Sequence, residues 1–135
     1  MRGPPARPSR GLMLRRGVLK RCPLCGGGGL FTGWFTMRDR CPRCGYLFER
    51  EEGFFLGAYV VNLAVTEGLL LLFAIVPCII LFANDPDVSV VPVVLAGVAA
   101  AVVGPLLFYP FSKTVWTAID LILRPADAPE PTDQR

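Results

Sequence analysis

Two long apolar stretches dominate the second half of the chain and predict its main elements. The first runs from Phe54 to Ala83 and holds one charged residue, Glu67, whereas the second runs from Val88 to Phe111 and holds none. Because a helix rises about 1.5 Å per residue, about 20 apolar residues cross the hydrocarbon core of a bilayer. Both stretches are long enough, so the pattern predicts an α-helical membrane protein built on a two-helix transmembrane hairpin.

Polar and turn-forming residues set the expected boundaries of these helices. We expect the first transmembrane helix over residues 53–83, a short external loop over 84–88 and the second transmembrane helix over 89–112. The loop contains the sequence Asn-Asp-Pro-Asp, which is typical of turns. Pro77 predicts a bend near the outer end of the first helix, and Cys78 is expected to pack as a small apolar residue.

Residues 113–124 continue the apolar pattern beyond the second helix. Val115, Ile119 and Ile122 fall on one helical face, and Trp116 is typical of a membrane interface. We therefore expect this segment either to extend the second helix or to lie as an amphipathic helix on the membrane surface.

The two ends of the chain have the composition of disordered segments. Residues 1–20 are rich in Arg, Pro and Gly and lack apolar periodicity, and residues 125–135 are polar and rich in proline. We expect a disordered basic tail at the N-terminus and a second disordered tail at the C-terminus.

Charge is distributed unevenly and predicts an orientation in the membrane. Residues 1–50 hold eleven basic and two acidic side chains, while residues 51–135 hold three basic and nine acidic ones. The predicted loop has no Lys or Arg, so the positive-inside rule places both termini in the cytoplasm. The basic tail is expected to contact anionic lipid rather than nucleic acid, because no aromatic residue lies among residues 1–20.

The chain contains no histidine. This excludes Ser-His-Asp and Cys-His catalysis, His-ligated haem and the usual catalytic zinc sites with imidazole ligands. No other set of residues forms a catalytic constellation. We therefore expect a protein without enzymatic activity and without a small-molecule substrate.

Four of the five cysteines form two matching motifs, Cys22-Pro-Leu-Cys25-Gly and Cys41-Pro-Arg-Cys44-Gly. Each motif turns both sulfurs to one side, and the glycine after the second cysteine permits a left-handed conformation that brings backbone N–H groups to the thiolates. Two such pairs predict a four-thiolate site for one Zn²⁺ per chain, with Zn–S bonds of about 2.3 Å. Residues 21–48 are thus expected to form a small cytoplasmic zinc ribbon.

Other chemistries of the four cysteines compete with zinc. Disulfides are disfavoured because the charge bias places the ribbon in the reducing cytosol. Iron binds in the same four-sulfur geometry and is the alternative, less favoured metal. A thioredoxin-type redox role is disfavoured because two pairs are present without a surrounding βαβ pattern. Four cysteines close the coordination sphere, which favours a structural metal over a catalytic one.

The residues between the two cysteine motifs predict a short hairpin around Gly33. Its apolar residues are Leu30, Phe31, Trp34, Phe35 and Met37. So small a module builds little core, and metal binding is expected to supply most of its folding free energy. The aromatic residues are expected to pack over the metal site or against the membrane surface, with a partner-binding face as the alternative.

Polar residues inside the predicted spans need partners. Glu67 is expected level with residues 98–100 of the second helix, where no basic residue lies, so we predict no internal ion pair. Its carboxyl is then neutral, or is satisfied by another subunit or protein. Asn62 and Thr66 are one turn apart and are expected to hydrogen-bond across helices. Small residues at spacing four are expected to form contacts of the hairpin or of a homodimer: Ala64 with Gly68, Gly97 with Ala101 and Ala100 with Gly104.

Taken in order, these features resemble the small bacterial membrane proteins of domain-of-unknown-function family 983. The resemblance rests on the paired CPxCG motifs, the two spans that follow, and the Pro-x-x-Lys step formed by Pro110 and Lys113. It covers residues 20 to about 124 and implies a bacterial inner-membrane protein without an assigned activity.

The sequence predicts a non-enzymatic module for interaction or assembly of a membrane complex. Its partners would be the lipid bilayer and either another protein or further copies of this chain. One alternative is a rubredoxin-like iron electron carrier or a metal-handling protein that uses the same four cysteines. A second is a membrane-tethered, nucleic-acid-linked regulator that uses the basic tail and the ribbon.

Overall fold

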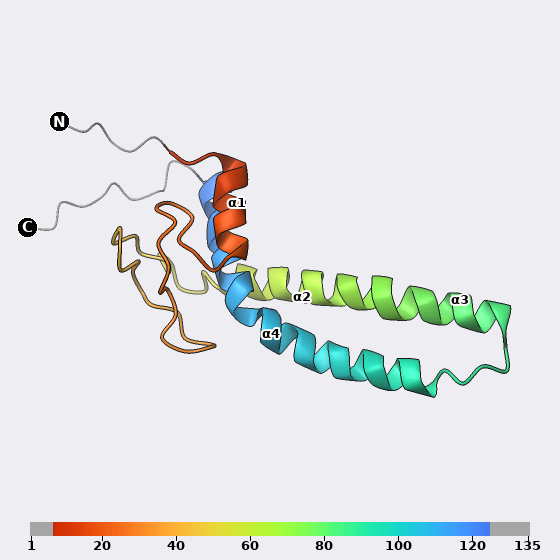
Figure 1. Ribbon diagram of the computed structural model, residues 1–135. Coiled ribbons are helices and arrows are strands. Elements are labelled where there is room, and N and C mark those ends of the chain that lie inside the picture. The colour runs from red at the N-terminus through yellow and green to blue at the C-terminus, as the bar shows by residue number, and fades with distance from the viewer. Residues whose placement is uncertain (1–6, 125–135) are drawn as a thin grey trace, which may run out of the picture.

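The computed structural model describes residues 7–124, and its regular elements are helices (Figure 1). They are α1 (Arg10–Val18), α2 (Leu56–Leu70), the π-helical turn η1 (Leu71–Ile75), α3 (Val76–Asn84) and α4 (Val91–Leu123). The ribbon connects α1 to α2 and contains two isolated antiparallel bridges, Phe31 with Met37 and Arg40 with Leu47. The first bridge closes the short hairpin predicted around Gly33.

The first apolar stretch forms one rod made of α2, η1 and α3. In η1 the N–H of Val76 donates to the carbonyl of Leu71, five residues earlier. Pro77 follows directly, and a proline ring clashes with the carbonyl four residues before it. A wider turn relieves that clash, so the structure has a π turn where the sequence predicted a bend.

The second rod, α4, packs antiparallel to α2 (Figure 1). The Asn62 Nδ2–H donates to the carbonyl oxygen of Pro105 at 3.0 Å, and a Cβ built on Gly104 would lie 3.7 Å from Thr66. Gly57 lies against the indole of Trp116, because a Cβ there would sit 2.1 Å from Trp116 Cε2.

This pairing places Glu67 level with about residues 100–103 of α4, because Asn62 meets Pro105 and Thr66 meets Gly104. The predicted level, residues 98–100, meets the edge of this range. Near the other end of α2, only a glycine at position 57 leaves room for the indole of Trp116. Of the predicted small residues, Gly97 and Gly104 of α4 lie against the first rod, whereas Gly68 has no atom near its Cβ position.

Helix α4 continues to Leu123, so residues 113–123 extend the second helix. The helix, which contains Pro105 and Pro110, turns before its last part, and this part runs alongside α1, across the direction of α2 (Figure 1). Hydroxyl groups of this part donate to carbonyls of the preceding turn: Ser112 to Tyr109 at 2.6 Å and Thr117 to Lys113 at 2.8 Å. Such bonds bend helices, as does a proline inside a helix.

The structure contradicts the predicted disorder of residues 1–20, because α1 lies within this segment. Ser9 caps the helix by accepting the N–H of Leu12 at 3.3 Å, and Met13 and Gly17 are buried. The Thr114 hydroxyl donates to the carbonyl of Gly17 at 2.6 Å. Nine residues are too few for a stable isolated helix, so packing on α4 is what stabilises α1. Residues 1–6 and the predicted tail at 125–135 lie outside the described residues.

One hydrophobic core joins α1, the ribbon and the last part of α4. Its buried members are Met13, Cys22, Leu30, Cys41, Tyr46, Phe48, Ala118 and Leu121. The ribbon therefore packs on the end of α4 instead of hanging from α2 by a flexible link. Two cysteines of the ribbon contribute to this core, so the metal site and the helices are stabilised together.

Replacing Gly17 by alanine is expected to release α1 from α4. A Cβ at Gly17 would lie 2.9 Å from the carbonyl oxygen of Thr114 and 3.2 Å from Ala118 Cβ. We expect overpacking to cost about 1–3 kcal/mol, which exceeds the gain in helix propensity of about 1 kcal/mol. Limited trypsin digestion at Arg15 and Arg16 should become faster. Gly11→Ala is the matched control, since its Cβ would meet nothing within 4 Å, and it should slow cleavage.

Candidate metal centre

The two cysteine motifs fold into matching turns. In the first, the N–H of Gly26 donates to the carbonyl of Cys22 at 2.8 Å, and in the second the N–H of Gly45 donates to that of Cys41 at 2.9 Å. Both glycines have a left-handed φ, +72° and +74°. This confirms the conformation expected of the glycine after each pair.

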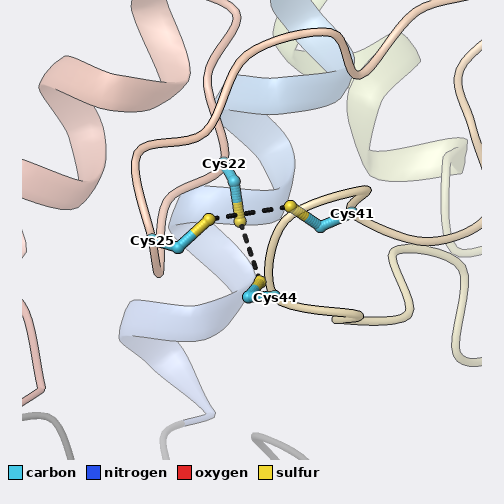
Figure 2. Close-up of side chains that lie close together, drawn as sticks. All are labelled: Cys22, Cys25, Cys41 and Cys44. Carbon is cyan, nitrogen blue, oxygen red and sulfur yellow. Dashed lines mark hydrogen bonds between the residues drawn. The ribbon is translucent and has the colours of Figure 1, made fainter.

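The fold brings all four predicted cysteines together (Figure 2). Their sulfurs lie within 4.8 Å of one another, with Cys22 Sγ 3.7 Å from Cys44 Sγ and Cys25 Sγ 3.6 Å from Cys41 Sγ. Four sulfurs around one ion with bonds of about 2.3 Å would be separated by about 3.8 Å in a tetrahedron. A disulfide needs about 2.05 Å, so these are free thiols, close enough together to bind one metal ion.

Burial and backbone N–H groups act in opposite directions on these thiols. Burial raises the pKa of Cys22, and it raises the pKa of Cys44 to about 11. Burial also disfavours the Cys41 thiolate, but hydrogen bonds from the N–H groups of Cys44 and Arg43 and from the thiols of Cys44 and Cys25 together outweigh it, so the pKa of Cys41 is lowered. A metal ion must displace protons from the first two thiols, and its affinity therefore falls as the pH falls.

The donor set fits a metal ion held for structure. Four thiolates satisfy a tetrahedral ion completely, which leaves no position for water or substrate. The N–H of Gly27 donates to Cys25 Sγ at 3.3 Å, a contact typical of the surroundings of metal-bound thiolates. Zinc and iron accept the same four sulfurs at nearly the same spacing, so the geometry defines a metal-binding cluster for either.

Arg16 of α1 supports the first cysteine motif, a contact that was not predicted from the sequence. Its Nη1 donates to the carbonyl of Leu24 at 2.8 Å and to that of Pro23 at 3.2 Å. Both carbonyls lie between the two cysteines of the motif. Helix α1 therefore fixes the turn that carries Cys22 and Cys25, and a signal for it would have required predicting α1 itself.

Trp34, at the tip of the ribbon hairpin, attaches the ribbon to α4. Its Nε1–H donates to the carbonyl of Leu106 at 2.8 Å. That carbonyl lies four residues before Pro110, which has no N–H to donate to it. The proline thus exposes an acceptor in α4, and the indole of Trp34 satisfies it. Nearby, Lys113 Nζ donates to the carbonyl of Phe35 at 3.2 Å.

Replacing Trp34 by phenylalanine is expected to loosen the ribbon tip. The change removes the hydrogen bond to the carbonyl of Leu106, which contributes about 1 kcal/mol. Hydrogen exchange in residues 30–37 should therefore become roughly fivefold faster. Exchange as slow as in the wild-type protein would show that the indole bond does not hold the ribbon.

A buried ion-pair cluster ties the end of the ribbon to the end of α4. The Arg50 guanidinium pairs with the Asp120 carboxylate, and Arg124 Nη2 contacts the other oxygen of Asp120 at 2.6 Å. Asp120 is 2% exposed. Sequence reasoning missed this cluster, although a single acid in an otherwise apolar segment was a signal that it needed a partner.

The polar residues predicted inside the spans are separate from the cysteine cluster. Asn62 is buried and bonds across helices as predicted. Thr66 does not, because its hydroxyl donates to the carbonyl of Asn62 in its own helix at 2.8 Å. Glu67 lies on an exposed face of α2 and makes no hydrogen bond or ion pair within the described part of the chain.

Together these features define a mostly helical protein with two helices long and apolar enough to cross a membrane and a four-cysteine cluster suited to a metal ion. The chain belongs to the family described as "Protein of unknown function (DUF983)", whose sequence profile matches residues 31–120. This confirms the resemblance, and the match includes Cys41 and Cys44 but begins after Cys22 and Cys25. Neither a curated protein nor a solved structure matches the chain.

Proposed function

We propose that this is a bacterial inner-membrane protein whose zinc ribbon forms a rigid cytoplasmic surface for assembly with a partner protein. The observation that carries the proposal is the core shared by the ribbon, α1 and α4. A metal site built into that core fixes the shape of the surface and its place on the helices. Such a role needs neither a catalytic group nor a substrate.

The outward faces of the two rods support insertion into a membrane. Leu56 is 69% exposed, Phe73 71% and Leu95 65%, in helices of 29 and 33 residues. Apolar surface of this extent is costly in water and favourable in lipid. Lys20 and Lys113 lie at the ribbon end of the rods, and the loop at the other end has no basic residue. This supports the orientation with the ribbon and both termini in the cytoplasm.

The exposed surface of the ribbon supports a partner with an acidic face. Arg38, Arg40 and Arg43 are all exposed and lie close to the second cysteine motif. Arginine is enriched where proteins bind one another, because its guanidinium pairs with carboxylates in fixed geometry. The partner would therefore bind beside the metal site, on the side of the ribbon that the helices leave free.

Iron electron transfer is the second candidate function. Cys44 is exposed, so one ligand of the cluster reaches the protein surface, where an electron could enter or leave. The same four-thiolate set holds iron in rubredoxin-like sites.

Metal content and an absorption spectrum test this part of the proposal. Protein purified from membranes without added metal is expected to contain one zinc per chain and to show no visible absorption band. Iron with a visible thiolate band would overturn the zinc ribbon and make electron transfer the leading function. Resistance of the protein to alkaline extraction from the same membranes tests insertion, and release into the soluble fraction would contradict it.

Crosslinking in membranes tests the assembly role. Wild-type protein is expected to form a specific crosslinked adduct with a second protein. Arg43→Glu should lose that adduct while keeping its metal, because the Arg43 side chain makes no hydrogen bond within residues 7–124, whereas Arg38 and Arg40 donate to the ribbon carbonyls of Gly29 and Gly45. Absence of any adduct from the wild-type protein, or the same adduct from the variant, would count against docking at this surface.

A further inference from the structure

An apolar groove of about 820 Å³ runs along one side of the helix pair. Residues of both rods line it, including Leu69 and Phe73 of the first rod and Gly97, Ala100 and Gly104 of α4. Along α4 it reaches from Pro92 to Phe111, a helical length of about 28 Å. Its volume lies within the range of about 300–1,000 Å³ that is usual for small-ligand sites.

A lysine marks the ribbon end of this groove. Lys20 Nζ lies 5.1 Å from the ring centre of Phe111, which lines the groove, and 5.1 Å from the ring of Trp34. Phe108, also in the lining, stacks on Phe111 with ring centres 6.0 Å apart. Among residues 7–124 no acidic side chain forms an ion pair with Lys20, so its charge is balanced only by aromatic faces.

We infer that this groove binds one anionic phospholipid of the bilayer, with an acyl chain along the helices and the phosphate at Lys20. The inference rests on the membrane insertion proposed above. In that orientation Lys20 lies at the cytoplasmic end of the groove, at the depth of lipid headgroups. An apolar channel with a single cationic end matches a molecule that has an apolar chain and one anionic head.

The charges favour a lipid over a second copy of this chain. Two copies inserted in the same orientation would bring Lys20 of one against the basic ribbon end of the other. The positive charges of the two copies would then lie close together at the Lys20 end of the groove, and their repulsion disfavours the dimer. A lipid phosphate meets that lysine with the opposite charge and also satisfies it as a hydrogen-bond acceptor.

Native mass spectrometry of the full chain tests the inference with two added lipids, phosphatidylglycerol and phosphatidylcholine. Wild-type protein is expected to retain one phosphatidylglycerol in preference to phosphatidylcholine. Lys20→Gln should reduce that preference about fivefold, the effect of one lysine near a membrane anion. Lys113→Gln removes the same charge away from the groove, over Phe55 and Tyr109, and should leave the preference unchanged.

Filling the groove provides the second arm of the test. Ala100→Phe places a ring in the groove and should abolish retention of either lipid, while Ala99→Phe, whose site is not part of the lining, should not. Unchanged retention in both Lys20→Gln and Ala100→Phe would overturn the inference, as would a lipid-free dimer. Alkaline extraction and zinc content, measured on the same preparations, test the proposed function separately. Protein that stays in the membrane and holds its metal but does not bind lipid selectively would refute only the lipid site.

Discussion

Replacing Cys22 by serine is expected to abolish metal binding and to unfold the ribbon. Cys22 is fully buried, supplies one of four ligands and belongs to the core shared with α1 and α4. In small zinc-finger peptides the apparent free energy of zinc binding is about 10–16 kcal/mol and is coupled to folding. Measured metal should fall from about one ion per chain to below roughly a tenth.

The effect should spread beyond the cysteines, because the core is shared. Proteolysis of residues 21–48 should become rapid, and cleavage within α1 should follow, since Arg16 holds the first cysteine motif. Cys78→Ser is the matched control: it removes the fifth cysteine, which lies in α3 outside the cluster. Full metal loading and a protected ribbon in Cys22→Ser would refute the four-thiolate site.

Replacing Asp120 by alanine is expected to be the most damaging change outside the cysteines. The substitution leaves Arg50, whose side chain is 14% exposed, without its carboxylate in a buried position. Breaking a buried ion pair on one side costs about 3–5 kcal/mol, because the remaining charge stays desolvated. The apparent melting temperature in detergent should therefore fall strongly, and the ribbon should separate from α4.

Two further variants separate charge from packing at this cluster. Glu51→Gln removes an exposed partner 3.4 Å from Arg124, and a surface pair of this kind is worth about 0–1 kcal/mol, so little change is expected. Replacing Arg50 by methionine and Asp120 by leucine together should recover much of the stability that Asp120→Ala loses. A melting temperature as low in the double variant as in Asp120→Ala would contradict the ion-pair explanation.

Features set by short-range spacing could be predicted from the sequence. Each cysteine pair spans four residues, and the glycine that follows it needs its left-handed φ whatever the rest of the chain does. The two apolar rods follow in the same way from continuous runs of apolar residues, whose helical form satisfies the backbone without outside partners. These local rules also carried the family resemblance, which the match over residues 31–120 confirms.

Contacts between distant residues could not be read from local patterns. Trp34 meets Leu106 across 72 positions and Arg50 meets Asp120 across 70, so both depend on how the helices turn and pack. The same holds for α1, whose nine residues are marginal alone and become a helix on α4.

The sequence by itself determined the two apolar helices, the paired cysteine turns and the family, because each depends on residues close together in the chain or on a motif read in order. Only the tertiary structure decided that the ribbon is part of one core with α1 and the end of α4. It also decided which residues of the two rods meet, such as Gly57 with Trp116 and Asn62 with Pro105. The physical reason is that burying apolar side chains and hydrogen-bonding unpaired carbonyls stabilise the fold whichever residues supply the contact. Sequence spacing does not specify which distant residues become neighbours.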